Sequence, residues 1–107
     1  MDQNKIAAAA RRYIKHKARL AIVPYGELQG LQETMAPYGD EVQKSWFDAL
    51  QGVDRTDPLL SRLLHEAYQE ALQDIRANIG EGEMLHRGLA DFHATFNVTE
   101  MLPKGEA

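Results

Sequence analysis

The stretch from Asp57 to Ile79 constrains the fold of this chain more than any other part of its sequence. Its apolar residues recur at the three- and four-residue spacing of one helix face, at Leu60, Leu63, Leu64, Ala67, Ala71, Ile75 and Ile79. Asp57 can cap a helix N-terminus, Pro58 suits the first helical position, and Gly80 can end the helix in the left-handed conformation. We therefore predict an amphipathic helix of about 23 residues, roughly 35 Å long, which must bury its apolar stripe on other helices to be stable.

Helical periodicity recurs in the rest of the chain, and no strand-like alternation persists. Helices are predicted over residues 2–22, over residues 25–36 (a short one), from about Asp40-Glu41 to just before Gln51-Gly52, and over residues 83–96. Brief connections join these segments. The prediction is an all-α fold: a compact antiparallel helical bundle of four main helices plus one short helix.

The length of 107 residues suits one domain with one modest core. We therefore expect a single helical domain over residues 1–107, with residues 103–107 as a loose tail. The chain has no cysteine, which excludes disulfides, thiol catalysis and cysteine-bound zinc and fits the reducing cytoplasm. No apolar run is long enough to cross a membrane, so no membrane association is expected. Asn97-Val98-Thr99 matches a glycosylation sequon, which we attribute to chance because no secretory signal is visible.

The N-terminal helix has an unusual charge distribution. Residues 1–25 hold six of the 12 Lys and Arg residues but only one of the 16 Asp and Glu residues, in a chain of net charge −4. On a helical wheel the apolar face is made by Ile6, Ala10, Tyr13, Leu20 and Ala21, with Ile14 at its edge. The opposite face is made by Lys5, Arg11, Arg12, Lys15, His16 and Arg19, while Lys17 projects from the apolar side.

This basic face has several interpretations, and the sequence leaves them open. It can bind phosphate groups of nucleic acid or anionic lipid, or it can bind an acidic protein partner. It can also be a solvated face that the acidic remainder of the same chain partly neutralises. The net negative charge and the lack of a recognised nucleic-acid-binding motif weigh against nucleic acid.

The adjacent aromatics Trp46 and Phe47 cannot both point into the centre of one apolar stripe, because neighbouring helical positions differ by about 100°. Trp46 shares a face with Val42 and Leu50, and Phe47 projects to the side. Phe47 is either core, if its helix lies between two layers, or part of an exposed patch that binds a partner or a second copy of the chain. The candidate partner-binding residues are Arg11, Arg12, Lys15, Arg19, Trp46 and Phe47.

Histidines near the C-terminus offer the clearest catalytic or metal-binding alternative. Glu83 and His86 match the Glu-x-x-His spacing of carboxylate-bridged di-iron bundles, but such a site needs the motif twice, and Glu83 points away from the apolar stripe. His86 and His93 flank that stripe on one side. They form either a pH-sensitive interface or, as the simpler interpretation, boundary positions that each find one hydrogen bond.

No motif identifies an activity: the chain contains no nucleophile elbow, glycine-rich phosphate loop or paired-carboxylate signature. We therefore expect no catalytic residue, no metal and no cofactor. The expected function is that of a small cytoplasmic, non-catalytic helical binding protein that acts as an adaptor, regulator or inhibitor of a larger protein. An acidic protein partner and a homodimer of this chain are both open alternatives. The alternatives are a nucleic-acid-associated regulator that uses the basic helix face, and a small metal-binding or hydrolytic helical protein that uses His86.

Overall fold

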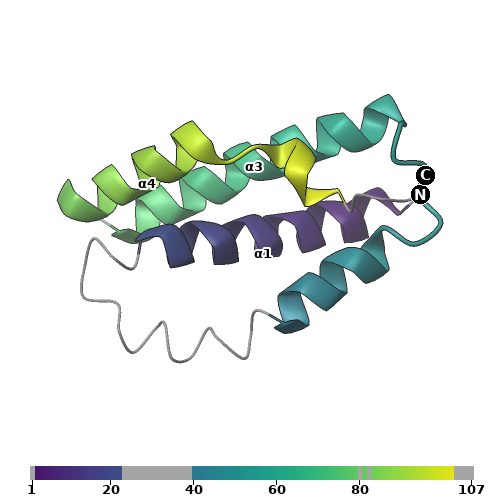
Figure 1. Ribbon diagram of the computed structural model, residues 1–107, viewed down its shortest axis with the longest axis horizontal. Coiled ribbons are helices and arrows are strands. Elements are labelled where there is room, and N and C mark those ends of the chain that lie inside the picture. The colour runs from purple at the N-terminus through teal and green to yellow at the C-terminus, as the bar shows by residue number, and fades with distance from the viewer. Residues whose placement is uncertain (1, 23–39, 80, 82, 103–107) are drawn as a thin grey trace.

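The computed structural model describes residues 2–22, 40–79, 81 and 83–102, and all regular structure within them is helical. The elements are α1 (Gln3–Ile22), a helix at residues 40–49, α3 (Pro58–Ile79), α4 (Glu83–Thr95) and the 3-10 helix η2 (Val98–Met101) (Figure 1). The all-α prediction is confirmed. The predicted helix over residues 25–36, the predicted helix end at Gly80 and the predicted tail over residues 103–107 lie outside the described residues.

The predicted cap at Asp57 is present, and Asp2 caps α1 in the same way. The Asp2 carboxylate accepts a hydrogen bond of 3.1 Å from the backbone N–H of Lys5, at the start of α1. The Asp57 carboxylate accepts one of 2.9 Å from the backbone N–H of Leu59, directly after Pro58. Because the first N–H groups of a helix have no partner within the helix, these two side chains fix where α1 and α3 begin.

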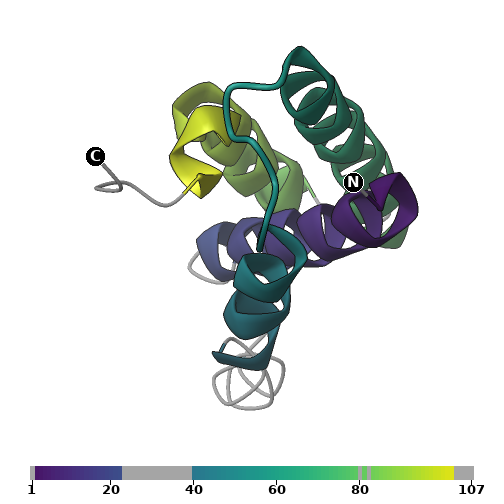
Figure 2. The same cartoon turned by 90° about the vertical axis from the view of Figure 1, so that its right-hand side faces the viewer.

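Helix α1 lies in the middle of the molecule, with α3 and α4 on one side and the 40–49 helix on the other (Figures 1 and 2). It contacts both α3 and α4, and its Tyr13 ring lies 6.3 Å from the Trp46 ring of the 40–49 helix. Its buried residues accordingly span most of its circumference: Ile6, Ala9, Ala10, Ile14, His16, Ala18 and Ile22. Ile14, expected at the edge of the apolar face, is fully buried. The chain is thus organised around α1 as much as around the 57–79 helix.

Helices α1 and α3 run in the same direction. Arg11 pairs with Glu70 and, one turn further along both helices, Lys15 pairs with Asp74. Figure 1 shows the same parallel course, and it shows α4 reversing the direction of α3. The expected antiparallel arrangement therefore does not describe the α1–α3 contact. The 40–49 helix returns the chain along the far side of α1, which leaves α3 free to pack directly on α1.

Residues 97–102 contribute buried side chains to the core. Trp46 is fully buried, and its indole N–H donates a hydrogen bond of 2.8 Å to the backbone carbonyl oxygen of Met101. Met101 is buried as well, so this segment packs locally rather than frays. Asn97 begins η2: its side-chain oxygen accepts hydrogen bonds from the backbone N–H and the hydroxyl of Thr99. The Asn97-Val98-Thr99 sequence therefore has a structural role as a helix cap.

Candidate functional site

The six candidate partner-binding residues occupy three different environments. Two α1 cations, Arg11 and Lys15, face α3 and form the ion pairs described above. Arg12 and Arg19 lie elsewhere around α1, and Phe47 lies on the surface of the 40–49 helix. The remaining candidate, Trp46, is in the core. The structure therefore does not gather the six residues into one surface.

The pairing of α1 with α3 neutralises part of the basic face within the chain. The Arg11 guanidinium lies 3.1 Å from the Glu70 carboxylate, and the Lys15 ammonium lies 2.6 Å from the Asp74 carboxylate. A hydrogen bond from Lys15, together with its charge, lowers the pKa of Asp74. The interpretation in which the acidic part of the chain balances its basic end thus has a direct structural counterpart at these two positions.

Arg12 and Arg19 are seven residues apart, so they lie on nearly the same side of α1, two turns from each other. Arg12 is exposed and Arg19 is half-buried. Lys17 is exposed, although the helical wheel places it on the apolar side, and its ammonium lies 5.6 Å from the centre of the Tyr13 ring, in cation–π geometry. The solvent-facing charge of α1 is therefore spread along the helix rather than concentrated at one point.

The aromatic pair of the 40–49 helix divides between core and surface. Trp46 is 0% exposed and Phe47 is 41% exposed. A phenylalanine side chain that keeps 41% of its surface in contact with water is available for contact with another molecule. Of the two aromatics named from the sequence, Phe47 is the one whose side chain a partner can reach.

The histidines of α4 occupy ordinary structural positions. The Tyr68 hydroxyl lies 2.7 Å from Nδ1 of His93, and the two rings stack 5.6 Å apart. The hydrogen bond expected of His93 is therefore present, and its side chain is exposed. Glu83 is exposed and His86 is half-buried. Among the described residues, no group of three or more metal-binding side chains lies close enough to hold an ion.

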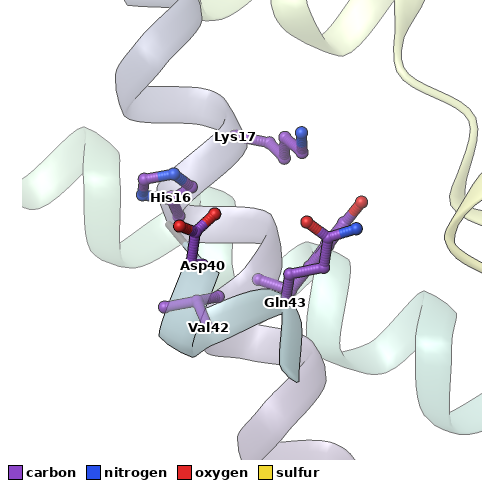
Figure 3. A pocket seen from close by; sticks show the side chains of 6 residues that line it. His16, Lys17, Asp40, Val42 and Gln43 are labelled. Carbon is purple, nitrogen blue, oxygen red and sulfur yellow. The ribbon is translucent and has the colours of Figure 1, made fainter. Parts of the chain in front are cut away.

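The polar cavity between α1 and the 40–49 helix was missed by sequence reasoning. Its volume is about 190 Å³, and its described lining residues are Tyr13, His16, Lys17, Asp40, Val42 and Gln43 (Figure 3). His16 was expected on the polar face of α1, but it is only 7% exposed, because the 40–49 helix packs on that side. No local pattern marks this position, since its burial depends on a helix more than 20 residues away in the sequence.

His16 is chemically distinctive within this cavity. Its Nδ1 is buried and has no hydrogen-bond partner within the described part of the chain. Burial lowers the pKa of His16, and the nearby positive charges of Lys17 and Arg19 lower it further, so the imidazole is neutral at neutral pH. Burial also raises the pKa of the neighbouring Tyr13, which keeps its hydroxyl protonated. With Gln43, the cavity thus combines three neutral polar groups with one cation and one anion.

No helix in the described ranges is both long and apolar enough to cross a membrane. Comparison with known proteins adds no relative: no protein-family model matches the chain, and neither the curated proteins nor the solved structures contain a match.

Proposed function

We propose that this chain is a small, non-catalytic cytoplasmic binding protein that acts as an adaptor, regulator or inhibitor of a larger protein. The observation that carries this proposal is the exposure of Phe47. It stands on a helix whose Val42, Trp46 and Ala49 are all buried, so its exposure does not result from loose packing of that helix. Aromatic residues in such positions are frequent anchors of protein–protein interfaces.

The charge distribution of α1 supports a protein partner over nucleic acid. Arg11 and Lys15 already pair with acids of α3, and binding phosphate there would require breaking both pairs. The net charge of −4 further disfavours a polyanion. Arg12 and Arg19 remain in the proposal as charges that steer association with an acidic partner more than they determine its affinity.

The experiment is affinity capture from the native cell with chemical cross-linking, followed by a binding measurement on the purified partner. Truncating an anchor residue of an interface typically weakens binding by roughly 30-fold or more. We expect this loss for Phe47→Ala. Met84→Ala is the matched control, because Met84 is the other large apolar side chain with high exposure in the described structure, at 51%, and it lies on α4. Equal affinity of the Phe47→Ala and Met84→Ala variants would refute the proposal.

A second copy of this chain is the alternative occupant of the Phe47 surface. Light scattering of the purified protein distinguishes the two cases. A dimer that Phe47→Ala converts to a monomer would place self-association at this surface. A monomeric wild-type protein would leave the residue available for a different partner.

A further inference from the structure

The cavity between α1 and the 40–49 helix contains a polar atom that the described structure leaves unsatisfied. Nδ1 of His16 is buried and without a partner there, and such an atom destabilises the fold unless something in the cavity bonds to it. The cavity of about 190 Å³ is larger than the roughly 150 Å³ that accommodates benzene in an engineered protein cavity. It therefore has room for a small organic molecule as well as for water.

The cavity also presents two opposite charges. Lys17 and Asp40 both line it, and Figure 3 shows the Asp40 carboxylate on the His16 side and the Lys17 ammonium on the Gln43 side. Neither forms an ion pair with a residue that the structure describes. A cation and an anion that face the same small volume without pairing suit a ligand that carries both signs of charge.

The hydrogen-bonding groups divide in the same way as the charges. On one side, the Asp40 carboxylate and a neutral imidazole nitrogen of His16 accept hydrogen bonds. On the other side, the Lys17 ammonium and the Gln43 side-chain amide donate them. Val42 supplies an aliphatic contact to the cavity. The acceptor side matches an ammonium group, and the donor side matches a carboxylate.

We propose that this cavity binds a small zwitterion of the free α-amino acid class. Its ammonium group lies toward Asp40 and His16, and its carboxylate lies toward Lys17 and Gln43. The size of the cavity sets the range from alanine to glutamine, about six to ten non-hydrogen atoms. This site is separate from the proposed contact of Phe47 with a protein, so either proposal can fail without the other.

The test is a titration of the isotope-labelled protein, followed by NMR, with each L-amino acid from alanine to glutamine at millimolar concentration. Binding shifts the backbone signals of residues 13–17 and 40–43 and the ring nitrogen signals of His16. Two analogues of the tightest binder, one without the amino group and one with the carboxylate converted to an amide, each bind roughly tenfold more weakly, because each loses a charge-assisted hydrogen bond.

Variants of the two exposed charges complete the test without disturbing the core. Lys17→Gln and Asp40→Asn each weaken binding of the amino acid roughly tenfold. The matched controls Lys44→Gln and Glu41→Gln change exposed residues of the 40–49 helix that do not line the cavity, and they leave the affinity unchanged. If no amino acid shifts these signals, the cavity holds only water and the inference is overturned. Equal binding of either analogue, or unchanged binding by the Lys17 and Asp40 variants, also overturns it.

Discussion

The indole N–H of Trp46 donates a hydrogen bond of 2.8 Å to the backbone carbonyl oxygen of Met101, 55 positions further along the chain. Both residues are buried. This bond joins the 40–49 helix to η2 and lies beside the central helix α1, whose Tyr13 packs against the same indole. The contact therefore links the middle of the chain to its C-terminal part.

Replacing Trp46 by Phe should lower the free energy of unfolding by about 2–4 kcal/mol. The smaller ring leaves a cavity in the core, and the Met101 carbonyl oxygen loses its donor while it stays buried. Urea denaturation followed by circular dichroism measures the loss, since the variant lacks the tryptophan signal. Amide hydrogen exchange should quicken in η2 more than in α3. A change below about 0.5 kcal/mol would contradict a structural role for this bond.

The cap at Asp57 should contribute about 1 kcal/mol to stability. Asp57→Ala removes the acceptor for the Leu59 N–H and leaves that group without its side-chain partner. Asp57→Asn is the matched control, because an asparagine side-chain oxygen caps a helix about as well as aspartate does. We expect the alanine variant to unfold at a lower urea concentration and the asparagine variant to behave like the wild type. Equal losses of stability in the two variants would instead show that the effect comes from the negative charge of Asp57.

These local features were predictable because their causes lie within a few residues of each other. Asp57 precedes Pro58 and a periodic apolar run, and Asp2 precedes an alanine-rich run, so helix starts could be predicted from the sequence alone. The buried face of the 40–49 helix followed equally from the spacing of Val42, Trp46 and Leu50. Such patterns determine helices but leave open how the helices pack.

The packing of the helices could not be predicted in this way, because it depends on which helices contact each other. A helical wheel assigns one buried face to α1, but this helix is covered by neighbours on opposite sides, so His16 is buried although it neighbours basic residues in the sequence. Likewise, the pairing of Lys15 with Asp74 joins residues 59 positions apart on helices that run parallel. No spacing within either segment encodes that register. The candidate cavity was missed for the same reason.

The Lys15–Asp74 pair should make the protein more sensitive to acid. The pKa of Asp74 is lowered from its ordinary 3.8, first by the hydrogen bond from Lys15 and then by its charge. A carboxylate with a lowered pKa stabilises the fold above its unfolded-state pKa, and this contribution is lost as the pH falls through the lower folded-state value. Asp74→Asn should therefore flatten the dependence of the urea midpoint on pH below about 4.

Asp48→Asn provides the control for this pH dependence. It removes an exposed carboxylate that pairs with no cation of the described structure, and it should leave the acid dependence unchanged. Added salt should reduce the difference between the Asp74→Asn variant and the wild type, because both partners of the Lys15–Asp74 pair are accessible to ions. A difference that persists at high salt would contradict an electrostatic origin.

His16 should titrate below the usual pKa of histidine, and its replacement should stabilise the protein most at acidic pH. Burial, followed by the charges of Lys17 and Arg19, lowers its pKa from 6.5 in the folded chain. At pH values between the folded-state and unfolded-state pKa of His16, the unfolded chain binds more protons than the folded chain. The contribution of His16 to the free energy of unfolding is therefore complete above about pH 6.5 and decreases as the pH falls through that window.

His16→Leu removes this proton linkage and the unsatisfied Nδ1, so its stability should exceed that of the wild type more at about pH 5 than at about pH 8. NMR titration of the His16 ring gives the pKa directly, and urea denaturation at the two pH values gives the stabilities. A measured His16 pKa at or above 6.5, or an equal effect of the substitution at both pH values, would contradict the lowered pKa of His16 in the folded protein.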